Sequence, residues 1–477
     1  MGMPEENEKP LTAEEILAEL ASDPRLSGNT DEETQVLSRS HHHGHSRHGH
    51  SHNHSHGHKR HRHRIRKNRR SSGSKKKARQ RREAIKEFFK FYRKRILMIL
   101  LVILLSASLI ATAIIIDGKH WIGGGSSTTS SSIAEDIKII TPDFSEDIVL
   151  VKAGVAEFVD PDNLLSTDEI LKKYSGTGRL DVGLPVTLSY RAEGLPPKCV
   201  VTSAVFEVAD NLDFDDSRVF MRASRKSSVD VYHLKTDTTY LYRITLNLSN
   251  GETVSTQGSF KTAKSPRILT IDGIVNVRDF GGRTTLDGKT VRQGVLFRGS
   301  ELDGAVEPTY KITDKGIADM LTVLNVQTDL DLRSSANNIG GFDPLGKNVE
   351  HIYFDASMYS DVFTENGKKS LRSIFAELAD KSNYPVYLHC TYGFDRTGTV
   401  CYLLGALLGM SEEDLITDYS VSGLAIGNMS LDNINGLRDQ LAAYEGETLK
   451  DDVECFLLSI GVTEQEIQNI RDIFLDD

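Results

Sequence analysis

The sequence predicts an α/β domain with a mainly parallel sheet flanked by helices, preceded by an all-β sandwich and by one transmembrane helix with a disordered N-terminal tail. Three observations support this prediction. Strand and helix patterns alternate over 264–477, short alternating apolar runs separated by turn residues fill 134–263, and an uncharged apolar run occupies 96–116. Strand–helix alternation is typical of parallel sheets, whereas closely spaced short strands are typical of antiparallel sandwiches.

Residues 1–95 are expected to form a disordered cytoplasmic tail with two compositionally biased segments. The 41–63 segment contains twelve of the sixteen histidines. Neutral imidazoles at this density bind divalent metals such as zinc or nickel, so this His-rich tail is a candidate divalent-metal ligand, with low-complexity disorder as the alternative. The 59–95 segment contains 19 Lys and Arg residues against two Glu residues, although the whole chain has a formal net charge of −10.

The basic segment is followed directly by 96–116, which contains 21 residues and no charged side chain. At a rise of 1.5 Å per residue, a helix of this length spans about 31 Å, roughly one bilayer core. A basic run beside such a span suits anionic lipid, so no nucleic-acid partner is expected. The positive-inside rule places the N-terminus in the cytoplasm. We therefore expect a single-pass protein of the cell membrane, in which the Gly/Ser linker 117–133 leads to extracytoplasmic domains.

Five short runs over 134–263 have the alternation of β-strands and are separated by turn residues such as Asn250-Gly251. They are 148–151, 186–190, 201–208, 240–246 and 258–262. The segment Leu234–Tyr240 resembles the tyrosine-corner run of fibronectin type III domains, with Thr236 in place of the usual proline. Nothing in this module suggests catalysis, so spacing or substrate presentation is the expected role.

Helices are predicted over 313–325, 370–381 and 397–410, with strands over 326–332 and 386–388 and a helix pair within 456–474. In a sheet of this kind the functional site is expected at the carboxyl ends of the strands. The four cysteines are far apart and form no C-x-x-C pair, which predicts neither a disulfide framework nor a metal site.

The stretch 386–400 combines an apolar strand, a glycine-containing loop and the start of a helix. Cys390 and Arg396 are separated by five residues. Backbone N–H groups at a helix N-terminus suit a phosphate dianion, and an arginine fork can bind two of its oxygens. The positive field also favours the thiolate of Cys390, which implies covalent phosphoryl transfer. The predicted phosphate-binding residues are Thr391, Tyr392, Gly393, Phe394, Asp395 and Arg396.

The alternative for Cys390 is a small buried residue at the end of a strand. Its neighbours favour the catalytic interpretation, because His389, Gly393, Arg396 and Thr397 all accompany it between an apolar strand and an apolar helix. Thr397 is expected to cap the helix or to donate its hydroxyl group to the sulfur atom. No cofactor and no metal is needed, since the loop amides and the guanidinium neutralise the phosphate charge.

The run His389–Gly398 resembles the signature loop of the bacterial tyrosine phosphatase family, which includes atypical tyrosine, serine and lipid phosphatases. The likeness extends over about 268–476 through three further blocks, 276–282, 296–302 and 330–334. The architecture also looks bacterial. The family usually has lysine at the position of Phe394, and that lysine is associated with phosphoinositide recognition.

The leaving oxygen needs a proton donor that faces the loop. Asp331 is the first candidate, because its Asp-Leu-Arg strand end matches the position where this family is expected to place its acid. Asp395 is the second candidate and would alternatively orient Arg396 or the hydrolytic water. Asp279 is the third, with a turn anchor paired with Arg278 as the favoured interpretation. His389 is expected to hydrogen-bond the loop, whereas Arg298 and Arg333 either support the site or pair with carboxylates.

These expectations describe a membrane-anchored phosphatase that hydrolyses phosphomonoesters, above all protein phosphotyrosine, with dual specificity left open. The first alternative keeps the chemistry and changes the substrate to a phosphoinositide or an inositol phosphate. The second is a non-catalytic adhesion or scaffold protein that only recognises phosphate. The expected partners are thus a phosphorylated protein or phospholipid substrate and the membrane.

Overall fold

The computed structural model describes residues 137–214, 217–223, 226–334, 344–427 and 430–476. The predicted tail 1–95, the transmembrane run 96–116 and the linker 117–133 lie outside these residues. Within the described ranges, a search for a helix with the length and apolar character to cross a bilayer finds none.

The α/β domain is built on a five-stranded sheet, as predicted. Its strand order is β13 (Glu350–Tyr353), β12 (Thr328–Asp331), β14 (Val386–His389), β11 (Leu296–Gly299) and β9 (Arg278–Asp279). The first four strands are parallel, whereas β9 pairs antiparallel with β11. All four residues of the central strand β14 are buried, which explains its uninterrupted apolar pattern.

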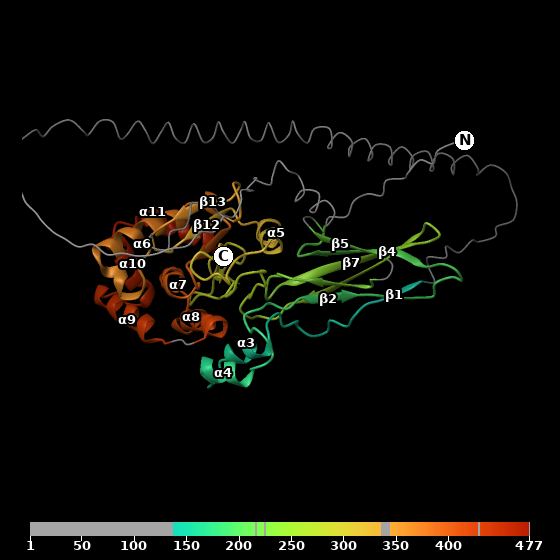
Figure 1. Cartoon of the computed structure of the whole chain (residues 1–477), viewed down its shortest axis with the longest axis horizontal. Helices are drawn as coiled ribbons and strands as arrows, with labels where there is room; N and C mark the ends of the chain where they lie inside the picture. The colour runs from blue at the N-terminus through green and yellow to red at the C-terminus, as the bar shows by residue number, and fades with distance from the viewer. Residues whose placement is uncertain (1–136, 215–216, 224–225, 335–343, 428–429, 477) are drawn as a thin grey trace, which may run out of the picture. The chain divides into compact units, whose positions relative to one another are not determined.

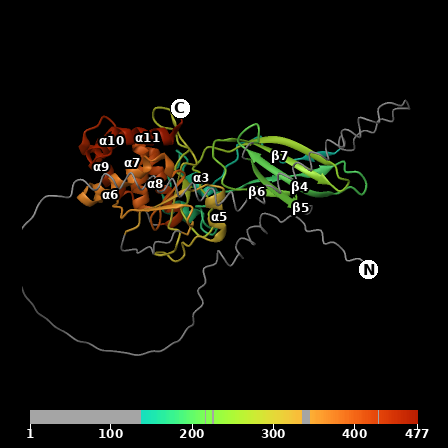
Figure 2. The ribbon, with the colours of Figure 1, turned by 90° about the horizontal axis from the view of Figure 1, so that it is seen from above.

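Helix α7 (Asp395–Leu408) follows β14 and packs against α8 (Glu412–Ile426) and α10 (Leu449–Ser459) (Figure 1 and Figure 2). Every residue of α7 from Thr397 to Leu408 is buried, and this burial explains why apolar residues occur on all sides of the helix. It ends at Gly409, whose φ of 86° closes the helix in the left-handed conformation. The remaining helices are α5 (Asp314–Thr322), α6 (Glu365–Leu378), α9 (Asp432–Leu441) and α11 (Glu464–Phe474), with the 3-10 turns η3 (Tyr359–Phe363), η4 (Lys381–Asn383) and η5 (Ala442–Tyr444). The short strands β10 (Thr290–Val291) and β15 (Leu475–Asp476) pair antiparallel.

Side-chain caps mark the starts of several helices, and one of these starts was misplaced by periodicity alone. Helix α6 begins at Glu365, earlier than predicted, because the Thr364 hydroxyl accepts from the amide of Gly367. Thr313 caps α5 in the same way, and Thr463 forms a capping box with Glu466 at the start of α11.

The β-rich region contains a four-stranded antiparallel sheet, in the order β5 (Arg218–Ala223), β4 (Val201–Ala209), β7 (Thr239–Leu248) and β8 (Thr253–Lys261). Two strand pairs accompany it: β2 (Val186–Ser189) with β6 (Ser228–Val231), and β1 (Lys138–Ile140) with β3 (Arg191–Glu193). Alternate residues of β7 are buried, among them Tyr240, Ile244 and Leu246. The hydroxyl oxygen of Tyr240 accepts a 2.8 Å bond from the Lys235 amide, which is the hydrogen bond of a tyrosine corner.

The prediction of a β-sandwich throughout 134–263 needs correction. The stretch contains two helices, α3 (Ala153–Phe158) and α4 (Thr167–Lys173), and the predicted strand 148–151 makes only isolated bridges. Ser166 and Glu169 form a capping box that starts α4. Val155 and Ile170 are fully buried in a cluster that includes Ile268, Val421 and Leu424 of the α/β domain. These helices therefore belong to the core of the α/β domain, and their apolar residues serve that packing.

We expect Tyr240→Phe to lower the free energy of unfolding of the sandwich by about 1–3 kcal/mol, because the Lys235 amide loses its acceptor. Tyr242→Phe is a matched control, since the Tyr242 hydroxyl bonds only the part-buried Thr141 hydroxyl and water can replace that partner. Urea denaturation followed by circular dichroism measures both. An equal loss in the two variants would contradict a special role for the corner bond.

Candidate functional site

The 390–396 loop connects the end of β14 to the start of α7. In the parallel register, Asp331 and Gly299 of the neighbouring strands lie beside His389, so the loop leaves the sheet at the carboxyl ends of its strands. This is the edge at which open α/β sheets bind their ligands.

The carbonyl oxygens of this loop are occupied by protein donors from several parts of the fold. The Asn276 side-chain amide donates to two of them, Tyr392 O at 3.0 Å and Gly393 O at 3.3 Å. Arg298 also donates to Gly393 O, at 2.9 Å. The other acceptors and their donors are Cys390 O with His389 Nδ1 (3.1 Å), Thr391 O with the Glu301 amide (3.0 Å), Phe394 O with the Gly398 amide (2.8 Å) and Asp395 O with the Thr399 hydroxyl (2.8 Å).

The amide N–H groups of the same loop differ from its carbonyl oxygens in their hydrogen-bond partners. Among the described residues, the amides of 391–396 donate to no protein acceptor. Helix α7 also begins without a side-chain cap, since its N-cap position is Phe394. Orphan donors at a helix N-terminus are satisfied by water or by an anion, and the helix dipole favours the anion. The amides of this loop are therefore suited to an anion.

Gly393 is required by the geometry of the loop. Its φ is 69°, in the left-handed region, and a Cβ atom added to it would lie 2.3 Å from the carbonyl oxygen of Gly299. Any other residue would push the loop away from β11.

Four of the predicted catalytic residues lie in or next to this loop: Cys390, Asp395, Arg396 and Thr397. Cys390 is only 2% exposed and Arg396 is half-buried. The Arg396 Nε donates to Ala356 O at 3.0 Å, while its two terminal nitrogens contact no protein acceptor among the described residues. Thr397 does not cap α7, because it lies inside the first turn; its fully buried hydroxyl has no partner within the described part of the chain. The terminal nitrogens of Arg396 and the Thr397 hydroxyl thus have no protein partner among the described residues.

Asp331 is placed differently from its predicted role as proton donor. Its carboxylate is fully buried and accepts from the Arg333 amide at 2.9 Å and from the Arg333 guanidinium at 2.8 Å. Burial alone would favour the neutral acid, but His389, His351 and Arg333 outweigh it and hold the pKa of Asp331 well below its usual range. A carboxyl group that its partners keep ionised is a poor proton donor.

Asp395 is half-buried in the first turn of α7, next to Arg396. Its Oδ1 accepts a 2.6 Å bond from the Tyr359 hydroxyl, which also lies 2.7 Å from the Tyr419 hydroxyl. Burial, together with the bond to Asp395, raises the pKa of Tyr359 far above its usual range, so this phenol remains a neutral donor. The tyrosine pair therefore orients the Asp395 carboxyl group.

Buried ionic groups that sequence analysis did not identify fix the surroundings of the loop. Asp418 of α8 pairs with three arginines, Arg278 at 3.0 Å, Arg283 at 3.2 Å and Arg298 at 2.5 Å. Burial opposes its charge, but these arginines hold the pKa of Asp418 well below its usual range. Arg298 therefore both pairs with a carboxylate and supports the loop. No local signal marks Asp418, which is a single acidic residue within a buried helix face.

Asp279 serves as an anchor, although not with the predicted partner Arg278, which pairs with Asp418. It is buried, pairs with Arg267 at 2.6 Å and accepts from the Gly281 and Gly294 amides. His389 lies 3.1 Å from Asp329, and its ring bonds Cys390 O as predicted. Burial would lower the pKa of His389, but Asp329 and Asp331 dominate and raise it to about 10.

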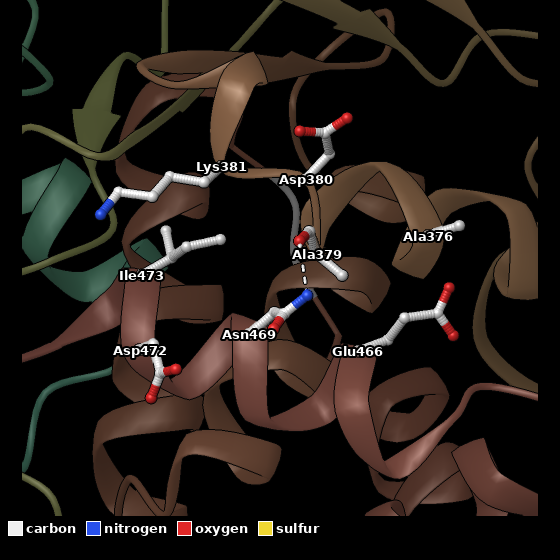
Figure 3. Close-up of a pocket in the computed structure, with 8 residues that line it drawn as sticks. All are labelled: Ala376, Ala379, Asp380, Lys381, Glu466, Asn469, Asp472 and Ile473. Carbon is white, nitrogen blue, oxygen red and sulfur yellow. Dashed lines mark hydrogen bonds between the residues drawn. The ribbon is translucent and has the colours of Figure 1, made fainter.

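A hollow of about 510 Å³ lies elsewhere on the domain (Figure 3). It is lined by Asp380, Lys381 and residues of α6 and α11 such as Ala376, Glu466 and Asp472. η4, which contributes Lys381, precedes the amino end of β14, whereas the 390–396 loop follows its carboxyl end. The Asp380 carboxylate already accepts from Ser382, and Glu466 is bound to Arg372 and Thr463. These groups stabilise helix ends.

Comparisons with known proteins agree with the geometry of the loop. Residues 269–476 match the model of the tyrosine phosphatase family. A tyrosine-protein phosphatase of Nostoc commune is 25% identical, with the match covering 32% of this chain and 67% of the relative. A protein of Cupriavidus necator, whose name also describes a tyrosine-protein phosphatase, is 26% identical, with the match covering 32% of this chain and 61% of the relative. The core catalytic domain of PP-IP phosphatase SIW14 from S. cerevisiae matches 35% of this chain and 92% of that chain, with 13% identity and a TM-score of 0.23.

The family-model match and the two curated relatives support the predicted family and confirm the predicted class, a phosphatase enzyme. The chain spans about two thirds of the length of these relatives or slightly less. The fibronectin-like module, the anchor and the substrate stay predictions.

The raised pKa of His389 predicts a dependence of stability on pH. Between about pH 6.5 and about 10 the folded protein retains a proton on this ring that the unfolded chain has lost. The free energy of unfolding should therefore fall as the pH rises through this window, by up to about 1.4 kcal/mol per pH unit for this group. A double variant, His389→Asn with Asp329→Asn, should show a shallower slope in urea denaturation at pH 7, 8 and 9. Parallel slopes for the two proteins would show that the ring is not charged in the folded state.

Proposed function

We propose that residues 264–477, together with the helices that precede them, act as a cysteine-dependent phosphatase on protein phosphotyrosine. The observation that supports this most directly is the 390–396 loop, in which protein donors occupy the carbonyl oxygens and leave the amides of 391–396 free for an anion. Cys390 and Arg396 are the first and last residues of that loop. A nucleophile, an oxyanion site and a guanidinium together suffice for phosphoryl transfer without a metal.

In the proposed first step, the Cys390 thiolate attacks phosphorus and an S–P bond forms as the P–O bond to the leaving group breaks. The leaving oxygen takes a proton from Asp395. In the second step, water attacks the phosphocysteine, Asp395 accepts a proton from that water, and the S–P bond breaks to release inorganic phosphate and the thiolate. The loop amides and Arg396 stabilise the equatorial oxygens in both transition states.

We assign the acid to Asp395 in preference to Asp331. The Asp331 carboxylate pairs with Arg333 and is held in its ionised form. A general acid, in contrast, must be protonated at the start of every cycle. Asp395 is within the loop sequence, only partly buried, and oriented by a neutral phenol.

Two observations support phosphotyrosine as the substrate. Both curated relatives are named as tyrosine-protein phosphatases. In the loop itself, the Tyr392 side chain is 39% exposed and meets Tyr310 edge to face, with ring centroids 5.8 Å apart. An aromatic rim offers favourable packing to an aryl phosphate. Phe394, in place of a lysine, removes a cation that a phosphoinositide headgroup would use.

We further propose that 96–116 anchors the enzyme in the cell membrane, with the folded domains outside the cytoplasm. The support is the uncharged run of one bilayer's length and the basic flank before it. In this arrangement the substrate is a phosphorylated protein presented at the outer surface.

A substrate panel tests the activity and its specificity. The full-length protein in detergent should hydrolyse phosphotyrosine peptides at least about tenfold faster, in kcat/KM, than phosphoserine peptides or short-chain phosphoinositides. Cys390→Ser should reduce turnover by several orders of magnitude, because a hydroxyl at this site is a far weaker nucleophile than a thiolate. Turnover by the serine variant near the wild-type rate would exclude Cys390 as nucleophile, and a preference for phosphoinositides would replace the substrate assignment.

A pair of isosteric variants tests the acid. Asp395→Asn should lower kcat for phosphotyrosine about 10²–10⁴-fold, the range for loss of a general acid. The loss should be much smaller for p-nitrophenyl phosphate, whose leaving group needs no proton. Asp331→Asn should leave kcat of the folded enzyme within about threefold and act mainly on stability, by breaking a buried ion pair. The reverse pattern would restore Asp331 as the acid.

A further inference from the structure

Residues 150–183, called here the α3–α4 segment, lie outside the region that matches the family model. Both of its helices nevertheless contact α8 of the α/β domain (Figure 1). Val155, Ile170 and Leu180 are buried in the same cluster as residues of α8, so the segment is part of the core of that domain.

At Gly183, the C-terminal end of the α3–α4 segment, the backbone packs directly against the backbone of the α/β domain. A Cβ atom on Gly183 would lie 2.2 Å from the Ile268 carbonyl oxygen, and the Thr270 hydroxyl donates to Gly183 O at 2.9 Å. Only glycine permits this approach. The residues just before Gly183 are therefore held in a defined position against the 268–276 stretch.

Asp181 uses that position to reach Asn276. Its carboxylate is 3% exposed and accepts a 2.8 Å hydrogen bond from the backbone amide of Asn276. Arg179 donates to the same carboxylate through Nε at 2.9 Å and a terminal nitrogen at 2.7 Å. The guanidinium offsets the cost of burying the charge, so the carboxylate is free to act as a strong acceptor for one backbone amide.

Asn276 binds two carbonyl oxygens of the loop. Its φ of 59° lies in the left-handed region, where a non-glycine residue needs support from its surroundings. Its side-chain amide donates to Tyr392 O and Gly393 O, and its Oδ1 accepts from Arg278 at 2.6 Å. A shift of the Asn276 backbone would move these donors away from the loop.

We propose that Asp181 is a positioning residue for the 390–396 loop, acting through the backbone of Asn276. The inference rests on the proposed function, since it assigns to a residue outside the family region a part in holding the phosphate-binding amides. It implies that the catalytic unit begins near residue 150. The matched region 269–476 lacks this support of its own loop.

The test compares three variants of the full-length protein. Asp181→Ala removes the acceptor, and Asp181→Asn keeps one acceptor oxygen for the Asn276 amide. Lys173→Ala is the matched control, because it breaks the exposed Lys173–Glu157 pair in the same segment without touching Asn276. The readouts are kcat and KM for p-nitrophenyl phosphate and the dissociation constant of tungstate by calorimetry, all below the melting temperature of every variant.

We expect Asp181→Ala to lower kcat by about 10–100-fold, the scale of a small misplacement of catalytic groups. Tungstate binding should weaken about tenfold, because the anion meets misdirected amides. Asp181→Asn should recover most of both quantities, and Lys173→Ala should match the wild type.

Unchanged kcat and unchanged tungstate affinity in folded Asp181→Ala would overturn the proposal, even if its melting temperature falls. Should that variant fail to fold, Arg179→Gln replaces it, since Arg179 is half-exposed and its loss only loosens the carboxylate. A three- to tenfold loss of kcat and of tungstate affinity is then expected, and no loss would overturn the proposal. If the wild type hydrolyses no phosphate ester, the proposed function fails, and the tungstate measurements still decide the role of Asp181.

Discussion

The 390–396 loop depends on one constraint: if its amides are to remain available to an anion, its carbonyl oxygens must be bound by other groups. Those oxygens are bound by groups from separate parts of the chain, namely the Asn276 side chain, the Arg298 guanidinium, the Glu301 amide and the His389 ring. Arg298 belongs to β11 and Glu301 follows that strand, whereas Asn276 precedes β9 and His389 ends β14 itself. The parallel sheet is therefore the frame that brings the carbonyl-binding groups to the loop, and the loop amides remain as the unfilled half of the hydrogen-bond pattern.

Burial of the charged groups that bind these carbonyl oxygens costs desolvation free energy, and this cost explains the ionic clusters around the site. Arg298 is fully buried and needs a counter-charge, which Asp418 supplies from α8 while it also pairs with Arg278 and Arg283. His389 is held as a cation by Asp329 and Asp331. Buried pairs of this kind add little net stability compared with apolar packing, but the removal of one partner is costly. Their role here is to fix geometry.

Local chemistry was predictable from the sequence, whereas long-range pairing was not. The loop, its cysteine and its arginine are contiguous, and the strands β2, β4 and β7 are visible in their alternation. Asp331 has a sequence context that suits an acid, and Arg333 lies only two residues further on. Its carboxylate also contacts His351 of the neighbouring strand β13, and no spacing reveals that contact. The helices α3 and α4 have 6 and 7 residues, too few to show a helical period among flanking strand-like runs. Asp181 and Asp418 act through partners that lie about one hundred residues away or more.

The position of Asp181 shows why a boundary drawn by sequence similarity differs from a boundary of folding. A similarity match begins where residues with shared motifs begin, and Asn276 is inside it. The left-handed Asn276 backbone and its buried amide, however, are satisfied by a carboxylate that lies before the match. A buried amide without an acceptor costs about 1–3 kcal/mol, and a non-glycine residue in a sparsely populated backbone region costs a similar amount. Any relative without an α3–α4 segment must therefore meet the same need at Asn276 with a different acceptor, or tolerate a looser loop.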